Sequence, residues 1–232
     1  MTTGITPALP TPILDGRRPD AIVEIVRLIR GGGVAAIATD TGYALSASLF
    51  HPEAVDRVFA MKQRDPRARL PVLVGTAADL PLVARDISAS AWHLIEHYWP
   101  GPLTLVLPAK AAVPRPVTGG RETVGVRVPG GKSCLQVLES LGEPVTGTSA
   151  NISGRPGART ASEVLDQLSG AVDAVLEDDN AVIFRAPSTV IEIADRGIEV
   201  HRVGALDAES LRRAAGMRVG ATPRLPTRYA RR

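Results

Sequence analysis

The alternation of helical and strand-like segments constrains the fold of this chain more than any other feature. Residues 20–30 carry apolar side chains at helical spacing and end in three glycines, and the apolar run 34–38 then predicts a buried strand. Further helices are expected at 52–62, 78–84, 88–98, 133–141 and 161–168. Further strands are expected at 71–74, 103–107, 124–128, 144–148, 174–176, 189–193 and 199–203. This alternation, with no internal repeat and no composition shift that marks a second domain, predicts an α/β sheet protein with helices over its faces.

The positive charge of the chain is concentrated at its C-terminal end. The formal net charge of the 232 residues is +3, and no acidic residue follows Glu209. Seven arginines lie beyond that point: Arg212, Arg213, Arg218, Arg224, Arg228, Arg231 and Arg232. Subtracting their seven charges from +3 leaves −4, so the preceding residues are mildly acidic. The tail either contacts RNA phosphates or is simply solvated. An aromatic content of 3% argues against a base-stacking surface for single-stranded nucleic acid.

The sequence predicts a cytoplasmic protein with no membrane segment. No apolar run approaches the roughly 18 residues of a membrane span, and residues 1–12 lack the basic start and apolar core of a signal peptide. The single cysteine, Cys134, excludes an internal disulfide and a cysteine-rich zinc site. We expect Cys134 to pack as a small apolar side chain in a helix.

The segment 145–154, which reads VTGTSANISG, has the composition of an anion site. A short apolar run leads into hydroxyls, an amide and glycines, which can donate hydrogen bonds to phosphate or carboxylate oxygens. Ser, Asn and Gly are also the commonest turn residues, so a simple turn at the end of a strand is the alternative.

Two short motifs near this segment resemble known catalytic loops but lack a required glycine. Residues 130–133, GGKS, match the end of a phosphate-binding P-loop, yet Val126 stands where that loop needs its first glycine. Residues 147–151, GTSAN, lack the final glycine of a nucleophile elbow. We therefore expect a strand-to-helix turn at 130–133 and a hydrogen-bonding rather than nucleophilic role for Ser149.

A third motif, His93-Leu94-Ile95-Glu96-His97, matches the H-x-x-E-H pattern of inverted zinc proteases. Its two histidines would share one helix face. Because a five-residue pattern is easily met by chance, we favour an amphipathic helix over a zinc site.

Seven separated segments together resemble, in order and spacing, the YrdC-like family of threonylcarbamoyl-AMP synthases. They are 39–45 (TDTGYAL), 62–64 (KQR), 99–104 (WPGPLT), 124–129 (VGVRVP), 148–154 (TSANISG), 188–190 (STV) and 202–204 (RVG). The resemblance covers about residues 18–215. It implies a single domain with a twisted mixed β-sheet covered by helices, between an N-terminal extension at 1–17 and a basic tail at 216–232.

The resemblance also implies an activity, in which L-threonine, bicarbonate and ATP give threonylcarbamoyl-AMP and pyrophosphate. A downstream tRNA threonylcarbamoyl transferase would then place the activated group on a tRNA adenosine. Such a site must hold a carboxylate, a carbamate and a triphosphate together, so it needs fixed cations and hydrogen-bond donors. Mg²⁺ would accompany ATP without dedicated protein ligands.

The family pattern carries over to ten positions of this sequence. It places Lys62 and Arg64 on the ATP phosphates as the catalytic cations. It implies nucleotide binding by Lys62, Arg64, Thr123, Ser149, Asn151 and Arg202. It implies threonine binding by Thr39, Arg127, Gly147 and Ser188. Each residue also has a structural alternative as a turn former or a surface cation, but these alternatives leave unexplained why such groups follow the predicted strands.

Two segments depart from the family pattern. The first motif usually reads T-D/E-T-x-Y-G-L-G, whereas residues 39–46 read TDTGYALS, a variant that resembles the YciO-type branch. After Arg64, the customary proline and Lys-Pro pair are replaced by Asp65, Ala68 and Arg69, and Arg67 or Arg69 is the candidate for the missing charge. The alternatives to the synthase are a YciO-like protein that binds double-stranded RNA or tRNA without synthase activity, and a related carbamoyl-transfer enzyme.

Overall fold

The computed structural model describes residues 10–178, 180–194 and 197–215, and their strands form two sheets. The first sheet has the order β1-β9-β2-β3-β8. Its strands are β1 (Ile13–Asp15), β9 (Ala174–Glu177), β2 (Ala35–Thr39), β3 (Gly42–Ser46) and β8 (Thr148–Ser149). It is mixed, because β1, β9 and β2 run parallel while β3 is antiparallel to both β2 and β8.

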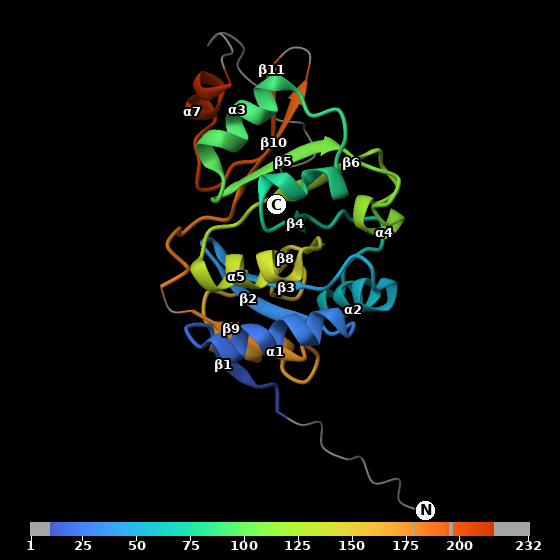
Figure 1. The fold of residues 1–232 in the computed structure, drawn as a ribbon, viewed down its shortest axis with the longest axis vertical. Coiled ribbons are helices and arrows are strands. Elements are labelled where there is room, and N and C mark those ends of the chain that lie inside the picture. Colours follow the sequence, from blue (N-terminus) through green and yellow to red (C-terminus); the bar gives the residue numbers. More distant parts are fainter. Residues whose placement is uncertain (1–9, 179, 195–196, 216–232) are drawn as a thin grey trace, which may run out of the picture.

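The second sheet has the order β11-β10-β5-β6-β4-β7 and is also mixed. Its strands are β11 (Gly197–Arg202), β10 (Thr189–Ala194), β5 (Leu103–Pro108), β6 (Thr123–Arg127), β4 (Val72–Leu73) and β7 (Val145–Thr146). Figure 1 shows this sheet in the upper half of the molecule and the five-stranded sheet in the lower half.

Helices cover the sheets through their apolar faces. On the five-stranded sheet, α1 (Pro19–Arg30) and α5 (Lys132–Leu141) pack against each other and against β2 (Figure 1). Ile25, Ile29 and Leu138 bury their side chains there with Ile37 of β2. α6 (Ala161–Leu168) contacts β9, and in the upper half α7 (Ala208–Ala214) packs on β11 and on α3 (Ala89–Tyr98). The remaining helices are α2 (Pro52–Lys62), the 3-10 helix η1 (Ala77–Leu82) and α4 (Arg115–Thr118).

The two sheets meet at Gly147, between β7 of one sheet and β8 of the other. The hydroxyl of Thr146 donates to Leu45 O (2.8 Å) and accepts from Ala47 N (3.1 Å), so the end of β7 is tied to the segment around β3. One hydrophobic cluster includes Leu45 of the first sheet and Leu105 of the second. The sheets therefore share a core.

The structure confirms the α/β class with mixed sheets and most of the expected elements. The strand expected at 144–148 is two short strands, because the chain changes sheet at Gly147. β1, which pairs with β9, lies within the segment that the sequence analysis assigns to the N-terminal extension. The strands β1 and β3 and the helices α4 and α7 were not predicted from the sequence. Cys134 is buried in α5, as expected.

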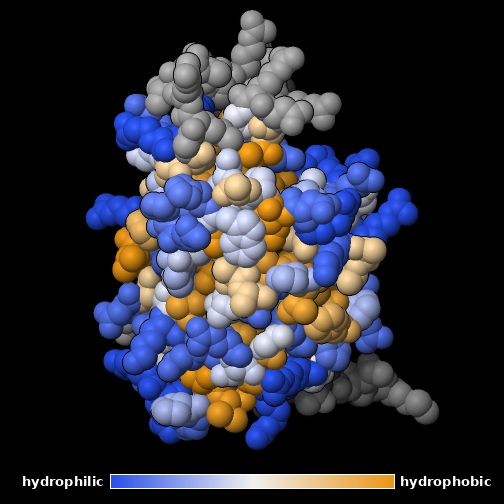
Figure 2. All heavy atoms as spheres, turned by 45° about the horizontal axis from the view of Figure 1, so that its top comes forward, coloured by the Kyte–Doolittle hydropathy of each residue, from blue (hydrophilic) through white to orange (hydrophobic). Residues whose placement is uncertain are grey.

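Three further expectations concern the turn at 130–133, the histidine motif of α3 and membrane-spanning helices. Residues 130–133 form the turn into α5, with Gly131 as its N-cap. His93, Glu96 and His97 lie on α3, and in the described part of the chain their ligand atoms do not converge as a metal site would require. No described helix is both long and apolar enough to cross a bilayer. Figure 2 shows apolar residues interspersed with hydrophilic ones on the face it displays.

Candidate functional site

A cavity of about 510 Å³ lies between the two sheets. It gathers eight of the ten residues predicted from the sequence, namely Thr39, Arg64, Arg127, Gly147, Ser149, Asn151, Ser188 and Arg202. Lys62 and Thr123 do not line it. A larger cavity of about 650 Å³ lies at the start of α5, but it contains none of the ten predicted residues. The convergence of separated polar groups therefore points to the smaller cavity.

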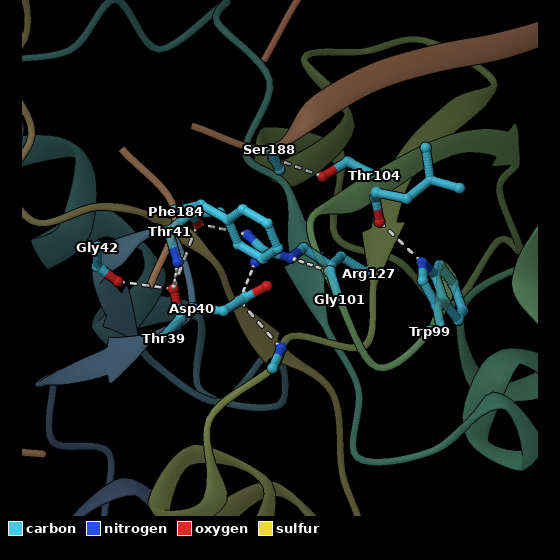
Figure 3. Close-up of polar contacts among 12 residues, drawn as sticks. Thr39, Asp40, Thr41, Gly42, Trp99, Gly101, Thr104, Arg127, Phe184 and Ser188 are labelled. Atoms are coloured by element: carbon cyan, nitrogen blue, oxygen red, sulfur yellow. Dashed lines mark hydrogen bonds and ion pairs between the residues drawn. The ribbon is translucent and has the colours of Figure 1, made fainter. Parts of the chain in front are cut away.

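Arg127, at the end of β6, forms the buried centre of the site. Its guanidinium pairs with the carboxylate of Asp40, donates from Nε to Gly101 O (2.8 Å) and from one terminal nitrogen to the hydroxyl of Thr41 (2.9 Å), as Figure 3 shows. Asp40 also accepts from Gly130 N (3.0 Å). Desolvation lowers the pKa of Arg127, and the negative charge of Asp40 opposes that shift. Three of the five guanidinium N–H groups thus donate to described residues, and the other two have no acceptor in the described part of the chain.

The turn between β2 and β3 places Thr39 and Thr41 on the same wall of the cavity. Thr39 donates from its hydroxyl to Gly42 O (2.6 Å), which closes the turn (Figure 3). This contact matches the structural alternative for Thr39. Thr41, which the sequence analysis did not select, is the hydroxyl that contacts Arg127.

Ser188 and Arg202 form the opposite wall. The hydroxyl of Ser188 lies 2.9 Å from that of Thr104 on β5 (Figure 3). Arg202, at the end of β11, donates to Ser188 O (2.9 Å) and to the Ser188 hydroxyl (2.8 Å). Desolvation, and then the charges of Arg127 and Arg64, lower the pKa of Arg202 although part of its side chain is exposed. These guanidinium groups therefore act on one another across the cavity.

Arg64 reaches the cavity, whereas Lys62 lies behind its wall. Arg64 donates to Arg69 O (2.7 Å), and its Nε is buried without a partner among the described residues. Desolvation lowers the pKa of Arg64. Lys62 is 1% exposed, and its ammonium donates to Ser149 O (2.5 Å), Asn151 O (2.8 Å) and Asn151 Oδ1 (3.0 Å).

Gly147 lines the cavity, whereas Thr123 does not. A Cβ at Gly147 would lie 2.5 Å from Leu73 Cγ, so the side chain of Leu73 restricts this position to glycine. The close approach to threonine expected at Gly147 stays a prediction. Thr123, at the start of β6, instead accepts from a guanidinium nitrogen of Arg69 (3.2 Å). Arg67 pairs with Asp65 (3.0 Å), and neither Arg67 nor Arg69 lines the cavity.

Three arginines that line the cavity lie outside the sequence motifs. Arg155 and Arg159 come from the loop after Asn151, and Arg185 comes from the segment before β10. Arg159 donates to Phe184 O (2.7 Å), which ties these two segments together. With Arg64, Arg127 and Arg202, the described lining holds six arginines and no Asp or Glu. The cavity is therefore suited to ligands with several negative charges.

A family model matches most of the chain. The Sua5/YciO/YrdC model, described as telomere recombination, matches residues 27–204. The chain belongs to the Sua5/YciO/YrdC family. Threonylcarbamoyl-AMP synthase of Pyrococcus abyssi (strain GE5 / Orsay) is 35% identical over 188 residues, which make up 81% of this chain and 55% of that protein. The chain thus spans little more than half the length of this relative.

Two solved structures of family members resemble this fold. P. abyssi Sua5 complexed with L-threonine has a TM-score of 0.86 at 31% identity, with 95% of this chain and 64% of that chain covered. E. coli YciO has a TM-score of 0.75 at 27% identity, with 87% of this chain and 97% of that chain covered. Both named branches of the family are therefore represented among its structural neighbours.

Proposed function

We propose that this chain is a threonylcarbamoyl-AMP synthase, which makes threonylcarbamoyl-AMP and pyrophosphate from L-threonine, bicarbonate and ATP. The observation that carries the proposal is the cavity lining of six arginines with no described Asp or Glu, beside threonine and serine hydroxyls. The likeness to a relative named threonylcarbamoyl-AMP synthase and to a Sua5 structure solved with L-threonine supports it. The product would be consumed by a tRNA threonylcarbamoyl transferase.

Separate groups of lining residues suit the two substrates. Arg127 presents its remaining N–H groups to the threonine carboxylate, between the hydroxyl groups near Thr39 and Ser188, with Gly147 providing the close backbone approach. Arg64 and Arg202 bind ATP phosphates, and the turn that holds Ser149 and Asn151 lies beside the nucleotide. Thr123 lies outside the described lining, so a contact with the nucleotide would require it to leave Arg69.

The proposed reaction needs alignment and charge stabilisation more than a general base. The threonine amine adds to carbon dioxide and releases a proton to solvent, or adds to bicarbonate and releases water, and in either case forms a carbamate. A carbamate oxygen then attacks the α-phosphorus of ATP, the new O–P bond forms, and the bond from that phosphorus to the bridging oxygen breaks to release pyrophosphate. Fixed guanidinium groups stabilise the charge on both phosphate groups without reorganising during the step.

Mg²⁺ would enter this cavity as part of its ATP complex. The described lining offers hydroxyls but no carboxylate, which fits an ion held by phosphate oxygens and water rather than by a protein cage. No step of the proposed reaction depends on a metal ligand from the chain.

The test is release of pyrophosphate from ATP, measured with and without L-threonine and bicarbonate. We expect release that requires both. Replacing Arg64 with Met should weaken ATP binding by about 2 to 5 kcal/mol if its phosphate partner is desolvated. Release that is independent of threonine, or none at all, would overturn the synthase assignment.

A second candidate is an RNA-binding protein of the YciO type without synthase activity. The TDTGYALS variant at 39–46 and the 97% coverage of E. coli YciO favour it. Its partner would be double-stranded RNA or tRNA, held in part by the arginines of the basic tail, which lies largely outside the described residues. Deleting residues 216–232, which leaves the buried Leu211 of α7 in place, separates the candidates: an RNA-binding protein should lose much of its RNA affinity, and a synthase should retain its turnover.

A further inference from the structure

Lys62 is a buried cation with no acidic partner among the described residues. It ends α2, is 1% exposed and forms no described salt bridge. The ammonium group has three N–H donors, and three oxygens accept from it: Ser149 O, Asn151 O and Asn151 Oδ1. All three acceptors belong to the turn at 149–151, so no donor is left for a phosphate.

The same residue also contacts the turn through its backbone. Lys62 O accepts from Ser153 N at 2.8 Å. Desolvation, and to a smaller extent the charge of Arg64, lower the pKa of Lys62 to about 7. Burying an ammonium group without a counter-charge is unfavourable, and the three hydrogen bonds offset part of that cost. The segment from Ser149 to Ser153 is thus held at both ends by one residue.

The side chain of Asn151 connects the turn to the next part of the loop by hydrogen bonds. Its Oδ1 accepts from Lys62 and from the Ser149 hydroxyl (2.5 Å), which fixes the orientation of the amide. Its Nδ2 then donates to Ile152 O (2.8 Å) and to Arg155 O (2.7 Å). Ser149 and Arg155 both line the cavity, so the network from Lys62 positions two residues of its lining.

We propose that Lys62 is a positioning residue, which fixes the loop from Ser149 to Arg155 against the cavity and does not itself bind the ATP phosphates. Two residues further on, Arg64 faces the cavity, because Gln63 adopts a left-handed backbone conformation (φ 48°) that ends α2 and turns the chain. Only the identity of the ligand rests on the proposed function. The placement of the loop is a property of the unliganded chain.

The test measures backbone amide exchange of residues 149–155 in the full chain without substrates. We compare the wild type with Lys62→Met, and use Arg64→Met as the matched control because it removes a cavity cation two residues away. Lys62→Met should raise exchange in this loop about tenfold, with the strands β2 and β3 unchanged. Arg64→Met should leave exchange there unchanged. Unchanged exchange in folded Lys62→Met would overturn the proposal, whether or not the chain proves to be a synthase.

A measurement on the wild type covers the case in which Lys62→Met does not fold. The ¹⁵N resonance of the Lys62 ammonium is followed while inorganic pyrophosphate is added at pH 6. We expect the Arg64 side-chain resonance to shift and the Lys62 resonance to stay in place. A shift of the Lys62 signal as large as that of Arg64 would show a phosphate contact and reject the positioning role.

Discussion

At the scale of single residues, the site depends on how buried charges are paired. Arg127 is 6% exposed and Asp40 is 2% exposed, and each provides the counter-charge of the other. The sequence predicted Arg127 as a ligand for a carboxylate. It did not predict that Asp40, one residue after Thr39, would form an ion pair with that guanidinium. That pairing arises from contacts between two strands far apart in the chain, which a local pattern does not encode.

Breaking this pair should destabilise the fold strongly. Arg127→Met or Asp40→Asn alone should lower the free energy of unfolding by about 3 to 5 kcal/mol, because each leaves a buried charged or polar partner unsatisfied. The double variant should lose much less than the sum. Urea unfolding of all four proteins measures the coupling.

The matched control is Arg18→Met, which breaks an exposed pair with Asp20 whose side chains are 67% and 68% exposed. It should change the free energy of unfolding by no more than about 1 kcal/mol. Strict additivity of the Arg127 and Asp40 effects would contradict a stabilising pair.

Lys62 should make stability depend on pH in a defined direction. Its pKa is about 7 in the folded chain and 10.5 as an ordinary lysine, so between these values the unfolded state binds the additional proton. The free energy of unfolding should therefore rise with pH, by up to about 1 kcal/mol per unit. The experiment compares urea unfolding of wild type and Lys62→Met between pH 7 and 9. Equal slopes for the two proteins would argue against a depressed pKa at Lys62.

At the scale of elements, helices with clear apolar periodicity and caps were predicted well. Residues 161–168 form α6, with Thr160 accepting from Glu163 N (3.2 Å) as its N-cap. β3 was missed because it follows β2 after only two residues, within a stretch that the sequence analysis treated as a binding motif. The division of 144–148 into two strands follows from the change of sheet at Gly147, which packs against Leu73 from another part of the chain.

Gly147 should be sensitive to a single added methyl group. Gly147→Ala would place Cβ 2.5 Å from Leu73 Cγ, and we expect a loss of about 1 to 3 kcal/mol in the free energy of unfolding. In a Leu73→Ala background the loss should shrink, because the clashing atoms are gone. Thermal and urea unfolding of the wild type and the three variants measure this difference.

Gly142→Ala is the control for that cycle. Gly142 has a φ of +63° and no atom within 4 Å of an added Cβ, so its substitution should cost about 1 kcal/mol through backbone strain alone. This cost should be the same with Leu73 or Ala at position 73. An equal cost for Gly147→Ala in both backgrounds would exclude the clash as its cause.

At the scale of the whole molecule, the sequence predicted which segments form a site but not how each side chain faces it. Eight of the ten predicted residues line one cavity because polar groups at strand ends converge where the sheets meet. Lys62 and Arg64 are only two residues apart, yet one is turned inward and the other faces the cavity. Arg155, Arg159 and Arg185 belong to irregular loops, whose path is fixed by long-range hydrogen bonds rather than by a local pattern.

The position of the cavity between two sheets has a thermodynamic consequence. An occupant that spans the cavity contacts Thr39 or Ser149 on one side and Arg127 or Arg202 on the other, so it joins the sheets across their boundary. Binding of the first ligand then includes the entropic cost of ordering the two sheets relative to each other. The second ligand binds to a protein in which they are already ordered. L-Threonine should bind several-fold more tightly in the presence of a non-hydrolysable ATP analogue, and the analogue should gain by the same factor. Calorimetric titrations in both orders measure this reciprocity, and independent affinities would show that the two sheets do not move relative to each other.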